Sequence, residues 1–536
     1  MKISRLFALF LVFTTTLTLI RCSSDIDKTD PVFDQKVSLK KRIALAVESD
    51  LLTKLKFPEG IKDSVYAFYK ARDFRPVWAN DSMVIGRGIK WKELLDFPCA
   101  LGLPDNRPFE FKEDSLSGTS IIQEFVLTAR LAQLQQDLKV GFLDTAVNAY
   151  RPIVSIDLKS LNRTVAQMDT VKDWGNWLAK MGPSRPEYRA LAKGLFKYAF
   201  RKELSNIHFE VPALVEDSLR CLALAEESLI DKGYLDPKKT DDESFWEAMG
   251  RFQGDNGLKA DGVIGVYTRK ALDESVRYKC HRAILSMERW RWREPFPMDR
   301  YLWVNIPEYK LRLFYNDSLL SEHRIVVGKP ENQTPQLSSK LRAIITLPYW
   351  TQPQSIASKE FLPAIQNNSN YAAKNHYKVY RGDTEVDPTT INWKRYKEKN
   401  FPFRVRQEPG NDNALGLVKF EFNNKYGVYI HDTPSKGFFN KDIRAYSHGC
   451  MRCDMPDSLA RFILTRDDKQ KMTRDSLDTL IARKEHFSIP LRKPIPLQVD
   501  YITVVVNEKG NLLFFPDVYS RDENYLKMMK IYPKVN

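Results

Sequence analysis

One cysteine and one histidine in the C-terminal half of the sequence have the types and surroundings that acyl-transfer chemistry needs. Cys450 follows a glycine in the run Tyr-Ser-His-Gly-Cys-Met-Arg, and His431 lies upstream of it. The thiolate is the nucleophilic form of cysteine, and a nearby imidazole can generate and hold it. The preceding Gly449 removes side-chain bulk, so a carbonyl group can approach the sulfur and backbone N–H groups can face its oxyanion. The sequence therefore predicts Cys450 as a nucleophile and His431 as its base.

The same part of the chain allows two other readings. His431, His448, Cys450 and Cys453 are four plausible zinc ligands, but no second paired cluster closes such a site, and we expect no metal. Cys450 and Cys453 have the spacing of a redox pair, although no thioredoxin-like pattern surrounds them. Cys453 is then either a packing residue or a partner for reversible oxidation of Cys450.

These residues resemble the signature of the YkuD-type L,D-transpeptidases, cysteine enzymes that cross-link bacterial peptidoglycan. The family motif is a histidine, a spacer and then Ser/Thr-His-Gly-Cys. Residue by residue, the resemblance places the proton donor and acceptor at His431 and the nucleophile at Cys450. It also places Ser447, His448 and Gly449 in the loop that shapes the oxyanion pocket.

Three further residues near the motif are candidates for substrate binding. Many family members have asparagine two residues after the cysteine, whereas this chain has Arg452, as large relatives do. An arginine there can contact a substrate carboxylate, and a solvated or structural arginine is the alternative. Arg444 has the same two interpretations. Tyr429 lies two residues before His431 in the same predicted strand.

The resemblance implies a two-step acyl transfer that forms 3-3 cross-links in peptidoglycan, in cell-wall biogenesis. A stem peptide would acylate the cysteine, and the amine of a neighbouring stem would take the acyl group, without any cofactor. It also implies that carbapenem β-lactams acylate Cys450. Two alternatives stay open: an L,D-carboxypeptidase on the same scaffold, and a catalytically silent peptidoglycan-binding envelope lipoprotein.

Length and charge restrict the class of protein. A chain of 536 residues exceeds one ordinary core, so we expect several domains. Its 83 Lys and Arg outweigh 68 Asp and Glu, for a net charge of +15, which favours anionic partners. The chain has no Arg-rich recognition helix or aromatic RNA-binding pattern, so nucleic acid is not expected as a partner. Peptidoglycan stem peptides and glycan are the expected partners.

The first residues predict export to the bacterial envelope. Residues 1–21 have a basic start and an apolar stretch too short for a comfortable membrane span, which is typical of a signal peptide. Cys22 ends a sequence similar to a lipobox, so a lipid tether at Cys22 is a candidate, although Arg21 departs from the usual small residue. The expected location is the periplasm, and residues 22–45 are expected to form a flexible leader.

The rest of the chain predicts a multi-domain α+β protein. Residues 46–215 show helical periodicity and are expected to form a helical scaffold domain. Residues 216–278 closely resemble the small three-helix peptidoglycan-binding domain. Residues 299–466 change to strand patterns and are expected to be a mostly β, YkuD-like catalytic domain. Within it, residues 357–405 lack strand alternation and are expected to be a capping insertion, which we interpret as a mobile lid.

Two expectations concern parts of the chain without predicted chemistry. Residues 467–536 are expected to close the catalytic domain, with a hairpin over Tyr501–Val506 and Leu512–Phe515. The six cysteines are too sparse for a disulfide scaffold. Cys99, Cys221 and Cys280 lie among apolar neighbours, so we expect them to be buried small hydrophobic residues.

Overall fold

The computed structural model of the chain describes residues 30–49, 51–54, 57, 59–105, 119–143, 157–200, 204–293, 299–316, 318–467, 474–483 and 485–529. The predicted signal segment 1–21 and Cys22 lie outside these residues. Within them, no helix combines the length and the apolarity that a membrane crossing needs. The chain divides into two compact units. Unit 1 comprises Met1–Asp96, Arg107–Gln136 and Ser155–Val171, and unit 2 comprises Phe97–Asn106, Asp137–Val154 and Lys172–Asn536.

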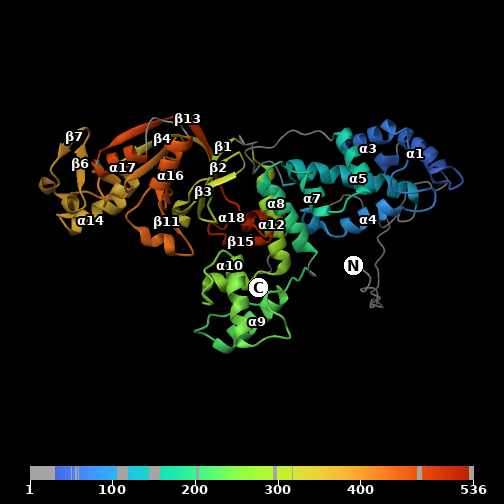
Figure 1. The fold of residues 1–536 in the computed structure, drawn as a ribbon, viewed down its shortest axis with the longest axis horizontal. Coiled ribbons are helices and arrows are strands. Elements are labelled where there is room, and N and C mark those ends of the chain that lie inside the picture. The colour runs from blue at the N-terminus through green and yellow to red at the C-terminus, as the bar shows by residue number, and fades with distance from the viewer. Residues whose placement is uncertain are drawn as a thin grey trace. The chain divides into compact units, whose positions relative to one another are not determined.

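Unit 1 is helical and carries the blue end of the colour scale in Figure 1. Its core contains large aromatic side chains, among them Trp78 and Trp91, which are fully buried. Glu124 is buried with them and accepts hydrogen bonds from the backbone N–H groups of residues 77–79. Burial raises the pKa of Glu124 to about 7. The helices that contribute to unit 1 are α1 (Leu39–Glu48), α2 (Leu51–Lys54), α3 (Glu59–Ala71), α4 (Gly86–Leu95), α5 (Ser120–Val140) and α6 (Leu158–Met168).

Two sequence-based boundaries in this region are wrong. The flexible leader predicted over 22–45 does not extend to residue 45, because helix α1 begins at Leu39 and buries both Leu39 and Ile43. The lysines of α1 make its composition polar, which led to the leader prediction, whereas its apolar residues follow the spacing of a helix. The scaffold predicted over 46–215 is also not one domain, because its residues 97–105 and 172–200 belong to unit 2.

Unit 2 contains the compact helical region expected over 216–278. Helices α9, α10 and α11 share a core that includes Cys221, Leu229 and Phe252. The longest buried helix of unit 2, α12, follows them directly and packs against α8. The bounds are α7 (Trp174–Ala179), α8 (Pro186–Ala199), α9 (Ser218–Asp231), α10 (Asp242–Asp255), α11 (Val266–Asp273) and α12 (Val276–Arg291).

Cys99 and Cys280 form a disulfide, which corrects the expectation that both are free hydrophobic residues. The bond joins the 3-10 helix η2 (Pro98–Leu101) to α12, with Cα atoms 6.5 Å apart. That separation lies within the range that disulfides require. The two cysteines are 181 residues apart in sequence, and local pattern gives no information on contacts of that kind. Cys221 is free and buried, as expected.

The C-terminal part of unit 2 is built on one nine-stranded sheet, drawn from yellow to red in Figure 1. The predicted mostly β domain is therefore confirmed. Its order is β11-β3-β12-β10-β9-β4-β13-β1-β2. The strands are β1 (Arg300–Asn305), β2 (Lys310–Tyr315), β3 (Ser318–Gly328), β4 (Leu337–Thr346), β9 (Val418–Phe422), β10 (Ile430–His431), β11 (Ala445–Ser447), β12 (Met451–Cys453) and β13 (Phe487–Asp500).

This sheet closes on itself, because β2 also pairs with β3. This pairing covers the edge that β2 would otherwise present, while β11 remains at the other end of the strand order. Strand β13 pairs with β4 on one side and with β1 on the other. The segment after residue 466 is therefore more than a closing element, since it supplies an internal strand of the nine-stranded sheet. The predicted hairpin is present as β14 (Val504–Val506) and β15 (Leu512–Phe514).

The capping insertion has its own small sheet, which the sequence-based interpretation missed. The strands pair in the order β5-β8-β6-β7 and pack on a core around Phe361 and Trp393. Long polar side chains cover the outer face, where the Arg404 guanidinium carbon lies 4.5 Å from the centre of the Tyr380 ring. These side chains interrupt the alternation of apolar and polar residues by which a strand is recognised in sequence. The elements are β5 (Trp350–Thr351), α13 (Gln354–Ile356), the π-helical turn η6 (Ala357–Phe361), α14 (Leu362–Asn367), α15 (Tyr371–Lys374), β6 (Tyr377–Arg381), β7 (Thr384–Val386) and β8 (Phe403–Gln407).

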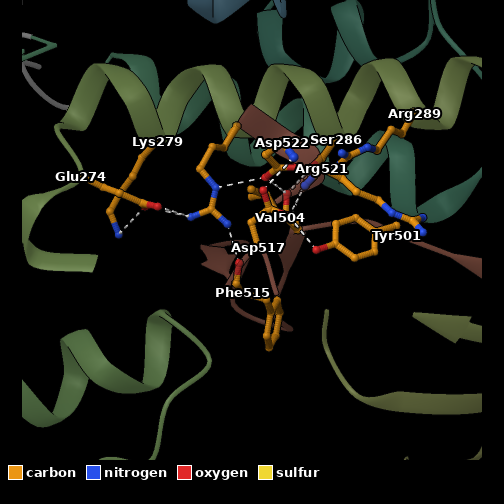
Figure 2. Close-up of polar contacts among 12 residues, drawn as sticks. Glu274, Lys279, Ser286, Arg289, Tyr501, Val504, Phe515, Asp517, Arg521 and Asp522 are labelled. Carbon is orange, nitrogen blue, oxygen red and sulfur yellow. Dashed lines mark hydrogen bonds and ion pairs between the residues drawn. The ribbon is translucent and has the colours of Figure 1, made fainter. Parts of the chain in front are cut away.

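A buried ion cluster joins α12 to the C-terminal helix α18 (Arg521–Met528), and Figure 2 shows it. The Asp522 carboxylate lies 3.3 Å from Arg282 Nε and 2.5 Å from Arg289 Nη1. It also accepts a hydrogen bond from the Thr503 hydroxyl at 2.6 Å. Despite burial, these arginines hold the pKa of Asp522 below its usual value. The carboxylate therefore stays charged and ties the end of the chain to α12.

Removing this buried charge should destabilise the protein strongly. We expect Asp522→Asn to lower the free energy of unfolding by about 3–5 kcal/mol, because the buried Arg289 guanidinium loses its anion. Arg282 then keeps only its ion pair with Glu274. Glu523→Gln is the matched control on the same helix turn: its ion pair with Lys527 is half exposed, and the expected loss is under about 1 kcal/mol. Urea unfolding curves measure both. Equal losses for the two variants would contradict a special role for Asp522.

Candidate active site

Two neighbouring parallel strands bring the predicted nucleophile and base together. In the ladder between β10 and β12, Ile430 lies opposite Met451 and His431 lies opposite Arg452. Ile430 and Met451 are fully buried in the domain core. Because side chains alternate along a strand, His431 and Arg452 face the other side of the sheet. Cys450 directly precedes β12 and flanks this pair.

The loop before Cys450 is fixed by the motif serine and by a glycine in a left-handed conformation. The Ser447 hydroxyl accepts a hydrogen bond from the Gly449 N–H at 3.1 Å and donates to the Cys450 carbonyl at 2.5 Å. Gly449 has φ +112°, a region that side chains disfavour. A Cβ atom there would meet its nearest neighbour at 3.6 Å, an ordinary contact. Glycine is therefore required for backbone conformation, rather than for the absence of bulk that the sequence suggested.

His431 is a buried, neutral imidazole in a defined tautomer. Its Nδ1 lies 2.5 Å from the Asp432 carbonyl oxygen. Since a carbonyl only accepts, Nδ1 carries the proton and Nε2 presents a free lone pair. Burial, and then the positive charge of Arg452, lower the pKa of His431 to about 3. The side chain can therefore accept a proton at Nε2 at neutral pH.

The Cys450 side chain is protonated in the resting site. Burial raises the pKa of the thiol. Hydrogen bonds from the Tyr429 backbone and hydroxyl, and the charges of Lys419 and Arg452, act in the opposite direction but do not outweigh burial. The site therefore holds a neutral thiol and a neutral imidazole at neutral pH.

The three substrate-binding candidates differ in how their polar groups are used. Among the described residues, none accepts a hydrogen bond or forms an ion pair with the Arg452 guanidinium, which lies 5.6 Å from the Phe438 ring centre. The Arg444 guanidinium instead donates to backbone carbonyls, including that of Lys441 at 2.9 Å. It also lies over the Tyr309 ring. Arg452 is thus available to a ligand, whereas Arg444 has a structural role.

His448 contacts the capping insertion, whereas Tyr429 lies beside the nucleophile. The Tyr429 side chain is partly buried beside Cys450, and burial followed by the charge of Cys450 raises the pKa of its hydroxyl. The His448 Nε2 lies 2.6 Å from a carboxylate oxygen of Glu360 in η6. His448 is therefore in contact with the insertion, a partner that the motif alone did not reveal.

Cys453 is a packing residue of the domain core. It is fully buried in the same core as Met451, and burial raises its pKa. The alternation of β12 places it on the opposite side of the sheet from Arg452. Across the described part of the chain, no group of three or more His, Cys, Asp and Glu is arranged to hold a metal ion.

Two residues near the nucleophile loop were missed as functional candidates. The Thr334 hydroxyl donates to the Gly449 carbonyl at 2.9 Å, and the Thr334 N–H donates to the Tyr519 hydroxyl at 3.1 Å. Tyr519 belongs to the C-terminal segment, for which no chemistry was expected. The sequence Gln333-Thr334-Pro335 contributed only to the family resemblance, and Tyr519 gave no signal in the sequence.

The state of the thiol leads to a measurable pH dependence. We expect the rate of alkylation of Cys450 by iodoacetamide to keep rising above pH 8.5, about the ordinary pKa of cysteine, because burial raises the pKa of this thiol. Peptide mass spectrometry of the protein sampled over time at pH 5–10 measures the rate at this cysteine. Alkylation that levels off below pH 7 would instead indicate a stored thiolate.

Comparisons with known proteins agree with this geometry over the catalytic region. Residues 299–471 match the family model of the YkuD L,D-transpeptidase catalytic domain. A Haemophilus influenzae protein named "Putative L,D-transpeptidase" is 36% identical over 222 residues, covering 41% of this chain and 44% of that protein. The chain thus spans less than half of that relative's length.

A solved L,D-transpeptidase from Mycobacterium smegmatis matches with 11% identity and a TM-score of 0.18, over 38% of this chain and 58% of that one. This match is too weak to support an argument. The family model and the identity to the relative agree with the pairing of β10, which carries His431, and β12, which directly follows Cys450. Residues 299–471 therefore belong to the YkuD family of L,D-transpeptidase catalytic domains.

Proposed function

We propose that this protein is an L,D-transpeptidase that forms 3-3 cross-links in peptidoglycan through a thioester on Cys450. One observation carries the proposal. Within the YkuD-matching segment, the β10–β12 ladder places a neutral His431, with a free Nε2, beside the strand that follows the Cys450 thiol. A neutral base beside a neutral thiol suits a reaction in which the proton moves together with nucleophilic attack.

In the first half-reaction, the Cys450 sulfur attacks the carbonyl carbon of the third residue of a stem tetrapeptide. A C–S bond forms as the thiol proton passes to His431 Nε2. The C–N bond to the terminal D-alanine then breaks, and His431 returns the proton to the leaving amine. The Asp432 carbonyl, bound to Nδ1–H, keeps the imidazole in the required tautomer throughout.

In the second half-reaction, the side-chain amine of a diamino acid on a neighbouring stem attacks the thioester. His431 takes a proton from this amine as the new C–N bond forms. The C–S bond breaks, and the proton returns to the sulfur, which restores the resting thiol. The balance needs no cofactor, oxidant or metal ion.

The proposal extends to the parts of the chain around the catalytic domain. The capping insertion would act as a lid, supported by the contact of its Glu360 with His448. The helices α9–α11 would bind peptidoglycan, supported by the exposed Trp246 and Val263 near the predicted glycine turn. We also propose an envelope location with a tether at Cys22, which rests on the N-terminal sequence alone.

The direct test is turnover of disaccharide-tetrapeptide by purified residues 23–536, with Cys450→Ala as the control. The expected product is a cross-linked dimer that has lost one alanine, together with an acyl-enzyme adduct on Cys450, both read by mass spectrometry. Cys450→Ala should form neither. A tripeptide monomer without any dimer would establish the L,D-carboxypeptidase instead, and identical results for the two proteins would contradict catalysis by Cys450.

Arg452 should contribute to binding of a substrate carboxylate. We expect Arg452→Met to raise KM about tenfold to a hundredfold, because a charge-assisted hydrogen bond contributes about 1.5–3 kcal/mol. The same change removes a charge that lowers the pKa of His431, so the acid limb of kcat/KM should move to higher pH. Arg452→Lys is the matched control: it keeps the charge, so its acid limb should stay in place. An unchanged KM in both variants would show that no substrate carboxylate binds there.

A further inference from the structure

The carbonyl group directly before the nucleophile is held by a fixed hydroxyl. Thr334 Oγ1 accepts a hydrogen bond from the Gly328 N–H at 2.9 Å. Its own proton is therefore directed to its second neighbour, the Gly449 carbonyl oxygen, also at 2.9 Å. Thr334 is fully buried, so water does not compete for this bond.

Holding that carbonyl also fixes the amide on the other side of the same peptide bond. The peptide group is planar and trans, so the Gly449 C=O and the Cys450 N–H point in opposite directions. Within the part of the chain that the structure describes, no group accepts a hydrogen bond from the Cys450 N–H. This donor lies on the nucleophile itself, where an oxyanion develops during acyl transfer.

Tyr519, from the C-terminal segment, holds Thr334 in place. Its hydroxyl accepts from the Thr334 N–H at 3.1 Å and donates to the Gly328 carbonyl at 2.6 Å. The loop that contains Thr334 approaches strand β3 so closely that a Cβ atom on Gly328 would lie 2.8 Å from the Thr334 nitrogen. The single hydroxyl of Tyr519 thus binds both partners of this close contact.

Tyr519 is itself anchored to the ion cluster. Its N–H donates to the Tyr501 hydroxyl at 2.9 Å, and the two rings stack with centres 5.5 Å apart. The Tyr501 hydroxyl donates to Asp517 at 2.6 Å, and Asp517 accepts from the Asp522 N–H at 2.7 Å. Figure 2 shows Tyr501, Asp517 and Asp522 together. Hydrogen bonds through Thr334, Tyr519 and Tyr501 therefore connect the Gly449 carbonyl to the C-terminal segment that Asp522 holds against α12.

We propose that Thr334 and Tyr519 are positioning residues that aim the Cys450 amide at the oxyanion of the acyl-transfer transition state. This inference rests on the proposed role of Cys450 as an acyl-accepting nucleophile. Thr334 acts directly on the Gly449–Cys450 peptide group, and Tyr519 acts through Thr334. Neither residue touches the reacting atoms.

The test compares two reactions of the same thiol that differ in whether an oxyanion forms. Acylation by p-nitrophenyl acetate passes through an oxyanion, whereas alkylation by iodoacetamide is a displacement at a saturated carbon and forms none. The measured quantity is the ratio of the two rates at Cys450, read by mass spectrometry against Cys450→Ala. A general loss of structure lowers both rates, while a misaimed amide lowers only acylation.

We expect Thr334→Val to lower this ratio about tenfold to a hundredfold, since loss of one oxyanion donor costs about 10²–10³. Thr334→Ser should restore it to within about threefold, because it keeps the hydroxyl. Tyr519→Phe should lower it less, about threefold to tenfold. Thr346→Val is the matched control, because it removes the fully buried hydroxyl at the end of β4, the strand that follows the Thr334 loop. That hydroxyl donates to the Glu485 carbonyl at 2.9 Å, and the ratio should stay unchanged.

An unchanged ratio in Thr334→Val, or an equal fall in Thr346→Val, would overturn the inference. If Thr334→Val does not fold, Tyr519→Phe decides: a ratio equal to that of the wild type overturns the inference. The proposed function fails separately. Wild-type protein that is acylated by the ester but does not turn over disaccharide-tetrapeptide would contradict the transpeptidase assignment and leave the positioning result intact.

Discussion

The parallel ladder between β10 and β12 is the interaction on which the site depends. It consists of two residue pairs, too few to be stable alone. It persists because β9 flanks β10 on its other side and β3 flanks β12, within a sheet that closes on itself. The relative placement of His431 and Cys450 is thus a property of the whole closed sheet. Local sequence around either residue would not hold them together.

Burial leaves one group of unit 2 charged and another group neutral. At Asp522, two guanidinium groups and a hydroxyl compensate the carboxylate, so the charge persists in the interior. At Cys450, the compensation is weaker, and both the thiol and His431 are neutral. A neutral pair avoids the cost of a buried thiolate–imidazolium pair. Its reactivity must then come from geometry at the moment of attack.

Sequence reasoning reached the features that short runs encode and missed those that depend on long-range packing. The motif led to the family that matches residues 299–471 and proposed Cys450 and His431, and the change to strand patterns predicted the mostly β domain. The Cys99–Cys280 disulfide and the Thr334–Tyr519 hydrogen bond join residues 181 and 185 positions apart. No periodicity reports such contacts. The strands of the capping insertion were missed because their outer faces carry arginine and tyrosine.

The position of β13 in the sheet has a consequence for how the protein is made. This strand fills the gap between β4 and β1, yet it is synthesised after the segment that carries His431 and Cys450. Until residue 500 has been added, β1 and β4 each present an unpaired edge. A nascent chain therefore completes the sheet around His431 and Cys450 only after β13 has been synthesised. A stop codon shortly after the YkuD-matching segment would leave Cys450 on an incomplete, aggregation-prone sheet.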